Sequence, residues 1–148
     1  MHIQRIVMGG DHAGVALKSY LAEHAPRTCH IEDLGPVSSD SVDYPDFAHP
    51  VAEQVAQAGD RTVGVLICGS GNGVCMTANK HPNIRAALCW SPELAALARA
   101  HNDANILCLP ARFIDQELAL DILRQFLDTP FEGGRHQRRV EKIPEMES

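Results

Sequence analysis

The strongest constraint on the fold is the run at residues 62–68, Thr-Val-Gly-Val-Leu-Ile-Cys, which is almost wholly apolar. A strand has this composition when helices cover both faces of a parallel sheet. Four more strand-like runs occupy residues 3–8, 29–34, 84–89 and 104–109, and turns and helix patterns separate the five. This alternation predicts an α/β fold: a five-stranded parallel sheet, doubly wound in the Rossmann or flavodoxin manner, with helices on both faces.

Turn and cap residues predict where individual helices begin. Ser91 and Pro92 have the order of a capping residue followed by proline in the first helical position. Pro45 and Pro50 predict that the helix ending near residue 58 begins late or is broken near its start.

Length and composition are those of one globular domain. The 148 residues, 45% of them hydrophobic and 22% charged, suit a single domain over residues 1–148, in which residues 131–148 form a basic and then acidic tail. The net charge of −6 disfavours a general nucleic-acid binder, and no apolar run reaches the roughly 20 residues that span a bilayer. The five cysteines form no CxxC pair and no zinc spacing with histidine. We therefore expect reduced thiols, a cytoplasmic protein, and neither metal nor other cofactor.

Ligands of doubly wound sheets bind beyond the carboxyl ends of the strands. We expect four segments at that edge: residues 11–12 after the first strand, residues 68–73 after the third, residues 101–102 just before the fifth, and Arg112 just after it. The basic tail could fold back over the same edge. Several segments that converge on one edge predict a binding site there.

The glycine-rich turn at residues 69–73 is a candidate oxyanion or phosphate site, because its backbone amides and the next helix can point at a ligand. It is neither a dinucleotide fingerprint, since Val74 stands in place of the third glycine, nor a P-loop. The alternative is a simple tight turn. Cys68 lies at the mouth of the turn, where the helix terminus favours a thiolate; the other four cysteines lack that context and are expected in the core.

Two histidines and two arginines complete the candidate set. His12 and His101 lie beside polar loop residues, and imidazole can carry protons during the opening of a sugar ring. If the tail is helical after its two glycines, Arg135 and Arg139 lie on one face and could hold one phosphate. The alternatives are solvated histidines and a solvated or RNA-binding basic tail.

An ordered set of motifs spans almost the whole chain and resembles the type B ribose-5-phosphate isomerases, a group related to the galactose-6-phosphate isomerase subunits. The motifs are G-D-H-A-G near the start, D-Y-P at residues 43–45, I-C-G-S-G-N-G, A-N-K at residues 78–80, H-N-D-A-N at residues 101–105, and F-E-G-G-R-H-Q-R-R-V.

The resemblance implies conversion of ribose 5-phosphate to ribulose 5-phosphate through an enediolate, without a metal. Cys68 would be the base, because Val74 occupies the place of the glutamate base found in another branch of the family. His101 would protonate the ring oxygen, aided by Asp11 and His12. The remaining implied contacts are Ser70 and the amides of Gly69, Gly71, Asn72 and Gly73 with the oxyanion, Tyr44 and Asn102 with sugar hydroxyls, and Arg112, Arg135 and Arg139 with the phosphate.

The resemblance also implies a homodimer or homotetramer with the site at a subunit interface. Three other interpretations remain open at this stage. They are an isomerase of allose 6-phosphate or galactose 6-phosphate, a non-catalytic flavodoxin-like module that binds a nucleotide or flavin, and an RNA-binding protein. The acidic whole and an aromatic content of 5% argue against the last.

Overall fold

The computed structural model describes residues 2–144, so the acidic end of the tail lies outside the described residues. Strands and helices alternate in the order β1 (Arg5–Gly10), the short 3-10 helix η1 (His12–Gly14), α1 (Val15–His24), β2 (His30–Asp33), α2 (Pro45–Gln57), β3 (Thr62–Cys68), α3 (Asn72–Ala78), β4 (Ala86–Leu88), α4 (Pro92–Asn102), β5 (Ile106–Pro110), α5 (Gln116–Asp128) and α6 (Arg135–Lys142). Within residues 2–144, no helix combines the length and the apolar character needed to cross a membrane.

The strands form the five-stranded parallel sheet that the sequence predicts, and their order is β2-β1-β3-β5-β4. The chain passes from β1 to β2 on one side, and β3 pairs with β1 on the other side. The carboxyl ends of β1 and β3 therefore lead in opposite directions, which opens a crevice between them. Doubly wound proteins bind their ligands at this point of the sheet.

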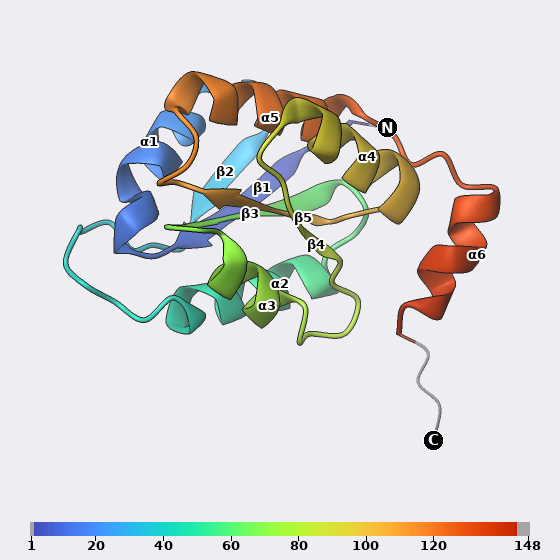
Figure 1. The fold of residues 1–148 in the computed structure, drawn as a ribbon, viewed down its shortest axis with the longest axis horizontal. Helices are drawn as coiled ribbons and strands as arrows, with labels where there is room; N and C mark the ends of the chain where they lie inside the picture. The colour runs from blue at the N-terminus through green and yellow to red at the C-terminus, as the bar shows by residue number, and fades with distance from the viewer. Residues whose placement is uncertain (1, 145–148) are drawn as a thin grey trace.

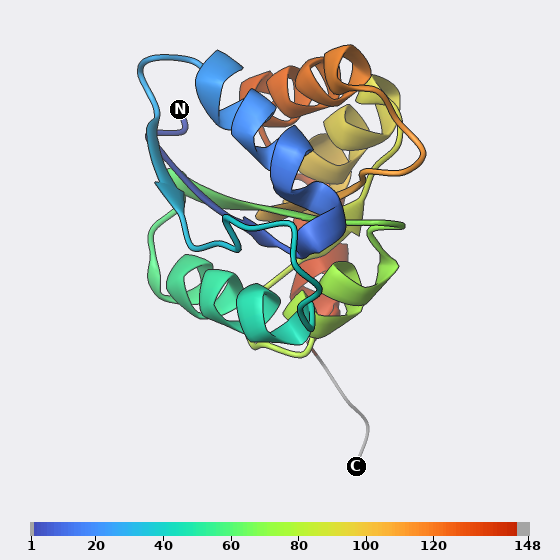
Figure 2. The same ribbon diagram turned by 90° about the vertical axis from the view of Figure 1, so that its left-hand side faces the viewer.

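Helices cover both faces of the sheet, with α1, α4 and α5 on one face and α2 and α3 on the other (Figures 1 and 2). Successive side chains of a strand alternate between two hydrophobic cores. In β5, Leu107 and Leu109 join the core beneath α1, α4 and α5, while Ile106 and Cys108 join the core beneath α2 and α3. Both faces of the central strands are therefore buried, which explains their continuous apolar sequence.

The structure excludes one of the two alternatives predicted for α2. The helix begins only at Pro45, and it continues through Pro50, where the second alternative placed a break. Pro45 occupies the first helical position, where a backbone N–H would have no partner within the helix, and Pro50 removes only one later bond. Burial of Val51 and Val55 against the sheet outweighs that loss. The Ser91 cap is confirmed: its Oγ accepts a hydrogen bond from the amide of Leu94 at 3.2 Å.

β1 runs two residues further than predicted, through both glycines to Gly10. The backbone of β3 is so close that a Cβ on Gly10 would lie 2.1 Å from the carbonyl oxygen of Ile67. A side chain would therefore separate the two strands that form the crevice.

We expect Gly10→Ala to lower the free energy of unfolding by about 1–3 kcal/mol, the usual cost of overpacking. Urea denaturation followed by circular dichroism measures this change. Gly59→Ala is the matched control, because a Cβ at that position meets no atom within 4 Å. Equal stabilities of the two variants would contradict the close packing of β1 against β3.

Candidate active site

Asp11 follows β1 and begins the candidate site at the carboxyl edge of the sheet. Its backbone N–H donates to the carbonyl of Ile67 at 3.1 Å, and its Oδ1 accepts a hydrogen bond from the amide of Ala13 at 3.0 Å. The carboxylate thus caps η1 and is almost buried. These bonds hold Asp11 beside the end of β3, as expected from the sequence.

The ring of His12 connects this edge to the loop that follows β2. Its Nδ1 accepts a hydrogen bond from the backbone N–H of Val42 at 3.2 Å. A nitrogen that accepts a bond carries no proton, so the neutral ring has its proton on Nε2. The loop leads directly to Tyr44 and α2, and His12 therefore helps to place that segment.

The turn after β3 is held by backbone bonds to the segment after β5. The carbonyl of Cys68 accepts from the N–H of Ala111 at 2.9 Å, and the carbonyl of Gly69 accepts from the N–H of Arg112 at 3.0 Å. Ser70 Oγ accepts a hydrogen bond from the amide of Asn72 at 3.2 Å. The turn is therefore rigid, and its shape is set by β3 and β5 together.

Gly71 permits the sharp entry into α3, because its φ of 77° lies in the left-handed region that suits glycine. No side chain caps this helix. The amide of Asn72, the first residue of the helix, is taken up by Ser70 Oγ. The amide of Gly73, which follows it, has no capping group within residues 2–144 and can meet an anionic oxygen.

Tyr44 and Arg112 flank the glycine turn on two sides. The Tyr44 ring lies so close to Gly73 that a Cβ there would be 2.5 Å from its Cε1 and Cζ atoms. The Arg112 guanidinium covers Gly69, with Nη1 3.2 Å from the position of a Cβ. The structure thus brings the glycine turn and Arg112 together at the edge where the sequence predicts them, and it places Tyr44 beside them.

Cys68 ends β3, and its side chain packs on the face of the sheet covered by α2 and α3, with Val7 and Val74 in the same core. The residue is 5% exposed. Its backbone opens the glycine turn, as predicted, while its side chain is shielded from bulk water. A base in this position acts only on a substrate seated directly against the turn.

The other thiols are expected core residues, and two of them are fully enclosed. Burial raises the pKa of Cys89 to about 12 and raises that of Cys108. A hydrogen bond with Cys108 lowers the pKa of Cys75, which burial partly opposes. Cys29 is half-buried, and burial raises its pKa too.

His101 and Asn102 do not lie at this edge, contrary to the expectation from the sequence. They end α4, which returns the chain to the amino end of β5. A residue that precedes a parallel strand must lie at the opposite edge from a residue that follows one. In Figure 1 the turn between β3 and α3 lies to the left, whereas α6 and the end of α4 lie to the right.

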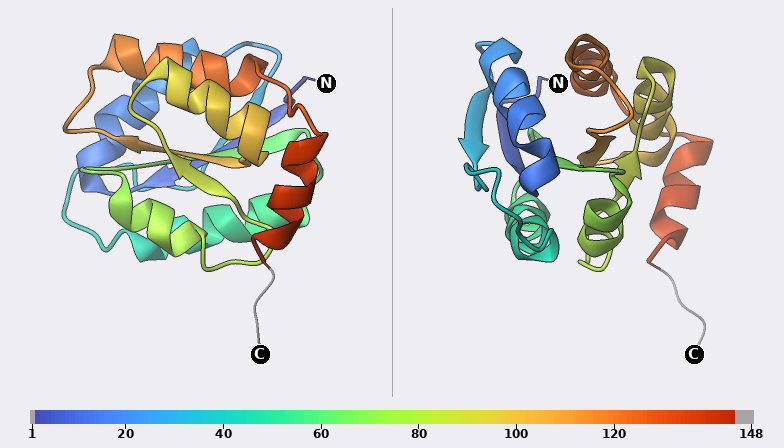
Figure 3. Two further views of the ribbon diagram at one scale, coloured as in Figure 1. Left: turned by 45° about the vertical axis from the view of Figure 1, so that its right-hand side comes forward. Right: turned by 60° about the vertical axis from the view of Figure 1, so that its left-hand side comes forward.

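The basic tail also lies at the amino edge rather than over the carboxyl edge. α6 contacts α4 and stands apart from both helix layers (Figure 3). The helix is formed as expected, with His136 and Val140 buried and both Arg135 and Arg139 exposed. The structure therefore divides the predicted site residues into two groups at opposite edges of one sheet.

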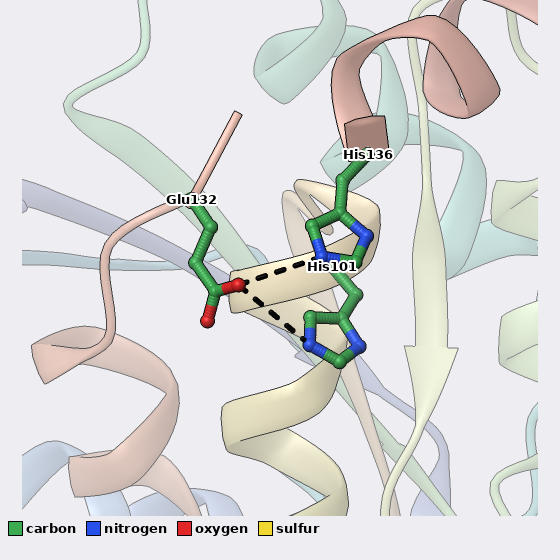
Figure 4. A group of neighbouring side chains, drawn as sticks. All are labelled: His101, Glu132 and His136. Atoms are coloured by element: carbon green, nitrogen blue, oxygen red, sulfur yellow. Dashed lines mark ion pairs between the residues drawn. The ribbon is translucent and has the colours of Figure 1, made fainter. Parts of the chain in front are cut away.

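Two residues absent from the predicted set surround His101. Its ring stacks on that of His136 with centroids 4.1 Å apart and an interplanar angle of 11°. Oε1 of Glu132 lies 3.9 Å from Nε2 of His101 and 3.4 Å from Nε2 of His136 (Figure 4). Glu132 and His136 are four residues apart within F-E-G-G-R-H, and this short spacing is the one feature of the sequence that could have indicated that the two side chains lie together. Their contact with His101 depends on how α6 packs against α4.

Comparisons with known proteins all lead to one family of sugar-phosphate isomerases. The sequence model of the family described as Ribose/Galactose Isomerase matches residues 6–143. The chain belongs to this family. The ribose-5-phosphate isomerase B of Escherichia coli is 42% identical over 146 residues, which are 98% of this chain and 97% of that protein. A probable ribose-5-phosphate isomerase B of Mycoplasma genitalium is 48% identical over 140 residues, which are 93% of this chain and 92% of the relative.

Solved structures of ribose/galactose isomerases have the same fold. The enzyme of Thermotoga maritima superposes with a TM-score of 0.92 at 46% identity, covering 98% of this chain and 100% of the other. That of Mycoplasma genitalium, solved with bound ribulose-5-phosphate, gives a TM-score of 0.91 at 46% identity and covers 97% and 95% of the two chains. The similarity therefore includes both edges of the sheet and α6.

Proposed function

We propose that this chain interconverts ribose 5-phosphate and ribulose 5-phosphate without a metal cofactor, and that two copies of the chain complete each active site. Membership of the isomerase family and the relative with bound ribulose-5-phosphate support the reaction. The observation that carries the assignment is the position of the glycine turn, which follows β3 beside β1 at the point where the strand order reverses. We also propose that the protein is cytoplasmic, because its five cysteines are free, as is usual in a reducing compartment.

In the proposed mechanism, the Cys68 thiolate removes the proton from C2 of the open-chain aldose. The electron pair of that C–H bond forms the enediolate double bond, and negative charge develops on the oxygen at C1. Ser70 and the amides of the glycine turn stabilise this charge. The proton on O2 then passes to O1, which becomes the C1 hydroxyl, and the thiol returns its own proton to C1, which leaves the ketone at C2 and restores the Cys68 thiolate. Asp11 and Tyr44 would orient the sugar, and Arg112 would bind its phosphate.

His101 would protonate the ring oxygen during ring opening, with Asn102 on a sugar hydroxyl and Arg135 and Arg139 on the phosphate. In one chain these four residues lie across the sheet from Cys68. A two-fold axis reverses the partner, so its amino edge can face the carboxyl edge of the first copy. We therefore propose a homodimer, or a homotetramer built from two such dimers, in which His101 of one copy serves Cys68 of the other.

The exposed surface near β4 supports this assembly. β4 is the last strand of the sheet, and no further strand within residues 2–144 pairs with it. Met76 on α3, Trp90 after β4 and Leu97 on α4 are 67%, 57% and 40% exposed. Exposed large apolar side chains on the segments that flank an unpaired strand are typical of an interface between subunits. α6 stands outside the helix layers and is free to contact a second copy.

An assay of ribose, allose and galactose phosphates side by side, in the presence of EDTA, tests the proposed reaction. We expect turnover of ribose 5-phosphate that EDTA does not reduce. Turnover confined to a six-carbon substrate, or lost in EDTA, would contradict the proposal.

The phosphate role of α6 gives a separate prediction. Arg135→Ala is expected to raise the KM for ribose 5-phosphate about 10-fold or more, because a hydrogen bond between charged groups contributes about 1.5–3 kcal/mol. Arg138→Ala is the matched control, since this exposed arginine of α6 lies on another face of the helix. Steady-state kinetics measure both. Equal KM values for Arg135→Ala and the unsubstituted chain would remove Arg135 from the phosphate site.

A further inference from the structure

Among residues 2–144, one group of three side chains could bind a metal ion. It consists of His101, Glu132 and His136, whose potential ligand atoms all lie within 4.8 Å of one another. Two imidazoles and a carboxylate are a ligand set that suits Zn²⁺ and related transition-metal ions. The proposed isomerase mechanism uses His101 alone, so the other two residues have no part in it.

The spacing of these atoms fits coordination better than direct bonding. Ligands about 2.1 Å from a tetrahedral zinc ion are about 3.4 Å from each other. Oε1 of Glu132 is 3.4 Å from Nε2 of His136 and 3.9 Å from Nε2 of His101. Neither contact is a hydrogen bond between the residues described, and both ring nitrogens face the same oxygen (Figure 4).

Backbone contacts hold two of the three ligands in place before any ion arrives. The amide of Glu132 donates to the carbonyl of Ala100 on α4 at 3.0 Å, and the amide of His136 donates to the carbonyl of Gly133 at 3.0 Å. The His136 side chain is 10% exposed, whereas that of His101 is 39% exposed. The more exposed His101 ring can therefore rotate away from the His136 ring until its Nε2 points at an ion bound by all three residues. The exposed side of His101 also leaves a path from solvent to this ion.

We propose that His101, Glu132 and His136 bind a divalent transition-metal ion such as Zn²⁺, and that the bound ion inhibits isomerisation. The inhibition rests on the proposed function, because coordination would occupy the imidazole nitrogen that must carry a proton to the ring oxygen. The ion is not a cofactor in this account. It is an inhibitor that binds the residues around His101, at the amino edge of the sheet, and leaves Cys68 at the carboxyl edge untouched.

Equilibrium dialysis of Zn²⁺ against the full chain tests binding without any substrate. His136→Gln and Glu132→Gln are each expected to weaken Zn²⁺ binding at least about 10-fold, since loss of even an outer-shell partner has an effect of that size. Glu132 is exposed, so its variant tests the site even if the buried His136 is needed for folding. Unchanged Zn²⁺ affinity in folded Glu132→Gln would overturn the site.

His81→Gln is the matched control, because His49 and His81 form a second histidine pair, with Nδ1 and Nε2 2.7 Å apart. The His81→Gln variant is expected to bind Zn²⁺ at the proposed inhibitory site with the affinity of the wild type. Cys68→Ala, dialysed in parallel, reports any Zn²⁺ held by that thiol, and we expect its affinity to be unchanged. A loss of affinity in His81→Gln or Cys68→Ala with none in Glu132→Gln would place the ion elsewhere.

Activity assays test the second half of the proposal. Zn²⁺ should inhibit the wild-type chain, EDTA should reverse the inhibition, and Glu132→Gln should need at least about 10-fold more Zn²⁺ for the same inhibition. Binding at the cluster without inhibition would overturn the regulatory role alone. A chain with no isomerase activity would contradict the proposed function, while dialysis would still decide whether the cluster binds the ion.

Discussion

Cys68→Ala is expected to lower kcat for ribose 5-phosphate at least about 100-fold, the low end of the effect of removing a general base. The C–H group at C2 of an aldose is only weakly acidic, so removal of its proton needs a base held against that carbon. Val74, the residue at the position of the alternative glutamate base, is apolar and fully buried. It cannot replace Cys68.

Cys75→Ala is the matched control for the loss of a thiol. Cys75 lies on α3, close to the glycine turn, and its pKa is lowered by the hydrogen bond with Cys108. We expect this variant to keep kcat within about threefold of wild type, as is usual for a residue outside the chemistry. A folded Cys68→Ala chain that loses less than about threefold in kcat would exclude Cys68 as the base.

At substrate concentrations that saturate the wild type, His101→Asn is expected to slow the reaction of ribose 5-phosphate at least about 100-fold but to slow the reverse reaction much less. Ribose 5-phosphate in solution is mainly a closed ring and must be opened. Ribulose 5-phosphate has its O5 blocked by the phosphate, so it is already an open chain. Without His101, the forward reaction depends on the small fraction of free aldehyde, whereas the reverse reaction can release the aldehyde and let it close in solution.

Initial rates measured from each substrate separately give this ratio. His24→Asn is the matched control, because His24 is exposed at the end of α1 and belongs to no part of the proposed site. We expect it to leave both rates unchanged. An equal loss in both directions for His101→Asn would show that the residue supports the proton transfer between carbons and not ring opening.

The elements with strong local signals were predictable from the sequence. The bounds of β3 and the cap at Ser91 are confirmed, because an apolar run and a capping residue followed by proline have few alternative structures. The glycine turn and Arg112 also lie where expected, since both follow central strands of a parallel sheet. The alternative of a break near the start of α2 was wrong, because burial of the apolar face of the helix, which is a tertiary effect, outweighed the signal of Pro50.

The edge on which His101 lies was mispredicted although the sequence contained the answer. A residue just before a parallel strand belongs to the amino edge, and the order α4 then β5 places His101 there. The stacking of His101 on His136 was beyond prediction, because it depends on the packing of α6 against α4 across more than thirty residues of chain. Local spacing relates Glu132 to His136 but says nothing of a third partner.

The proposed active site contains Cys68 from one copy and His101 from another. This sharing can be tested with a dimer co-expressed and purified with one Cys68→Ala chain and one His101→Asn chain, with ribose 5-phosphate as substrate. One of its two sites then combines the intact Cys68 with the intact His101, so we expect about half of the wild-type activity, against almost none in either parent dimer. If each chain instead held a complete site of its own, both sites would be defective. A mixed dimer as inactive as its parents would therefore exclude a site shared between two copies.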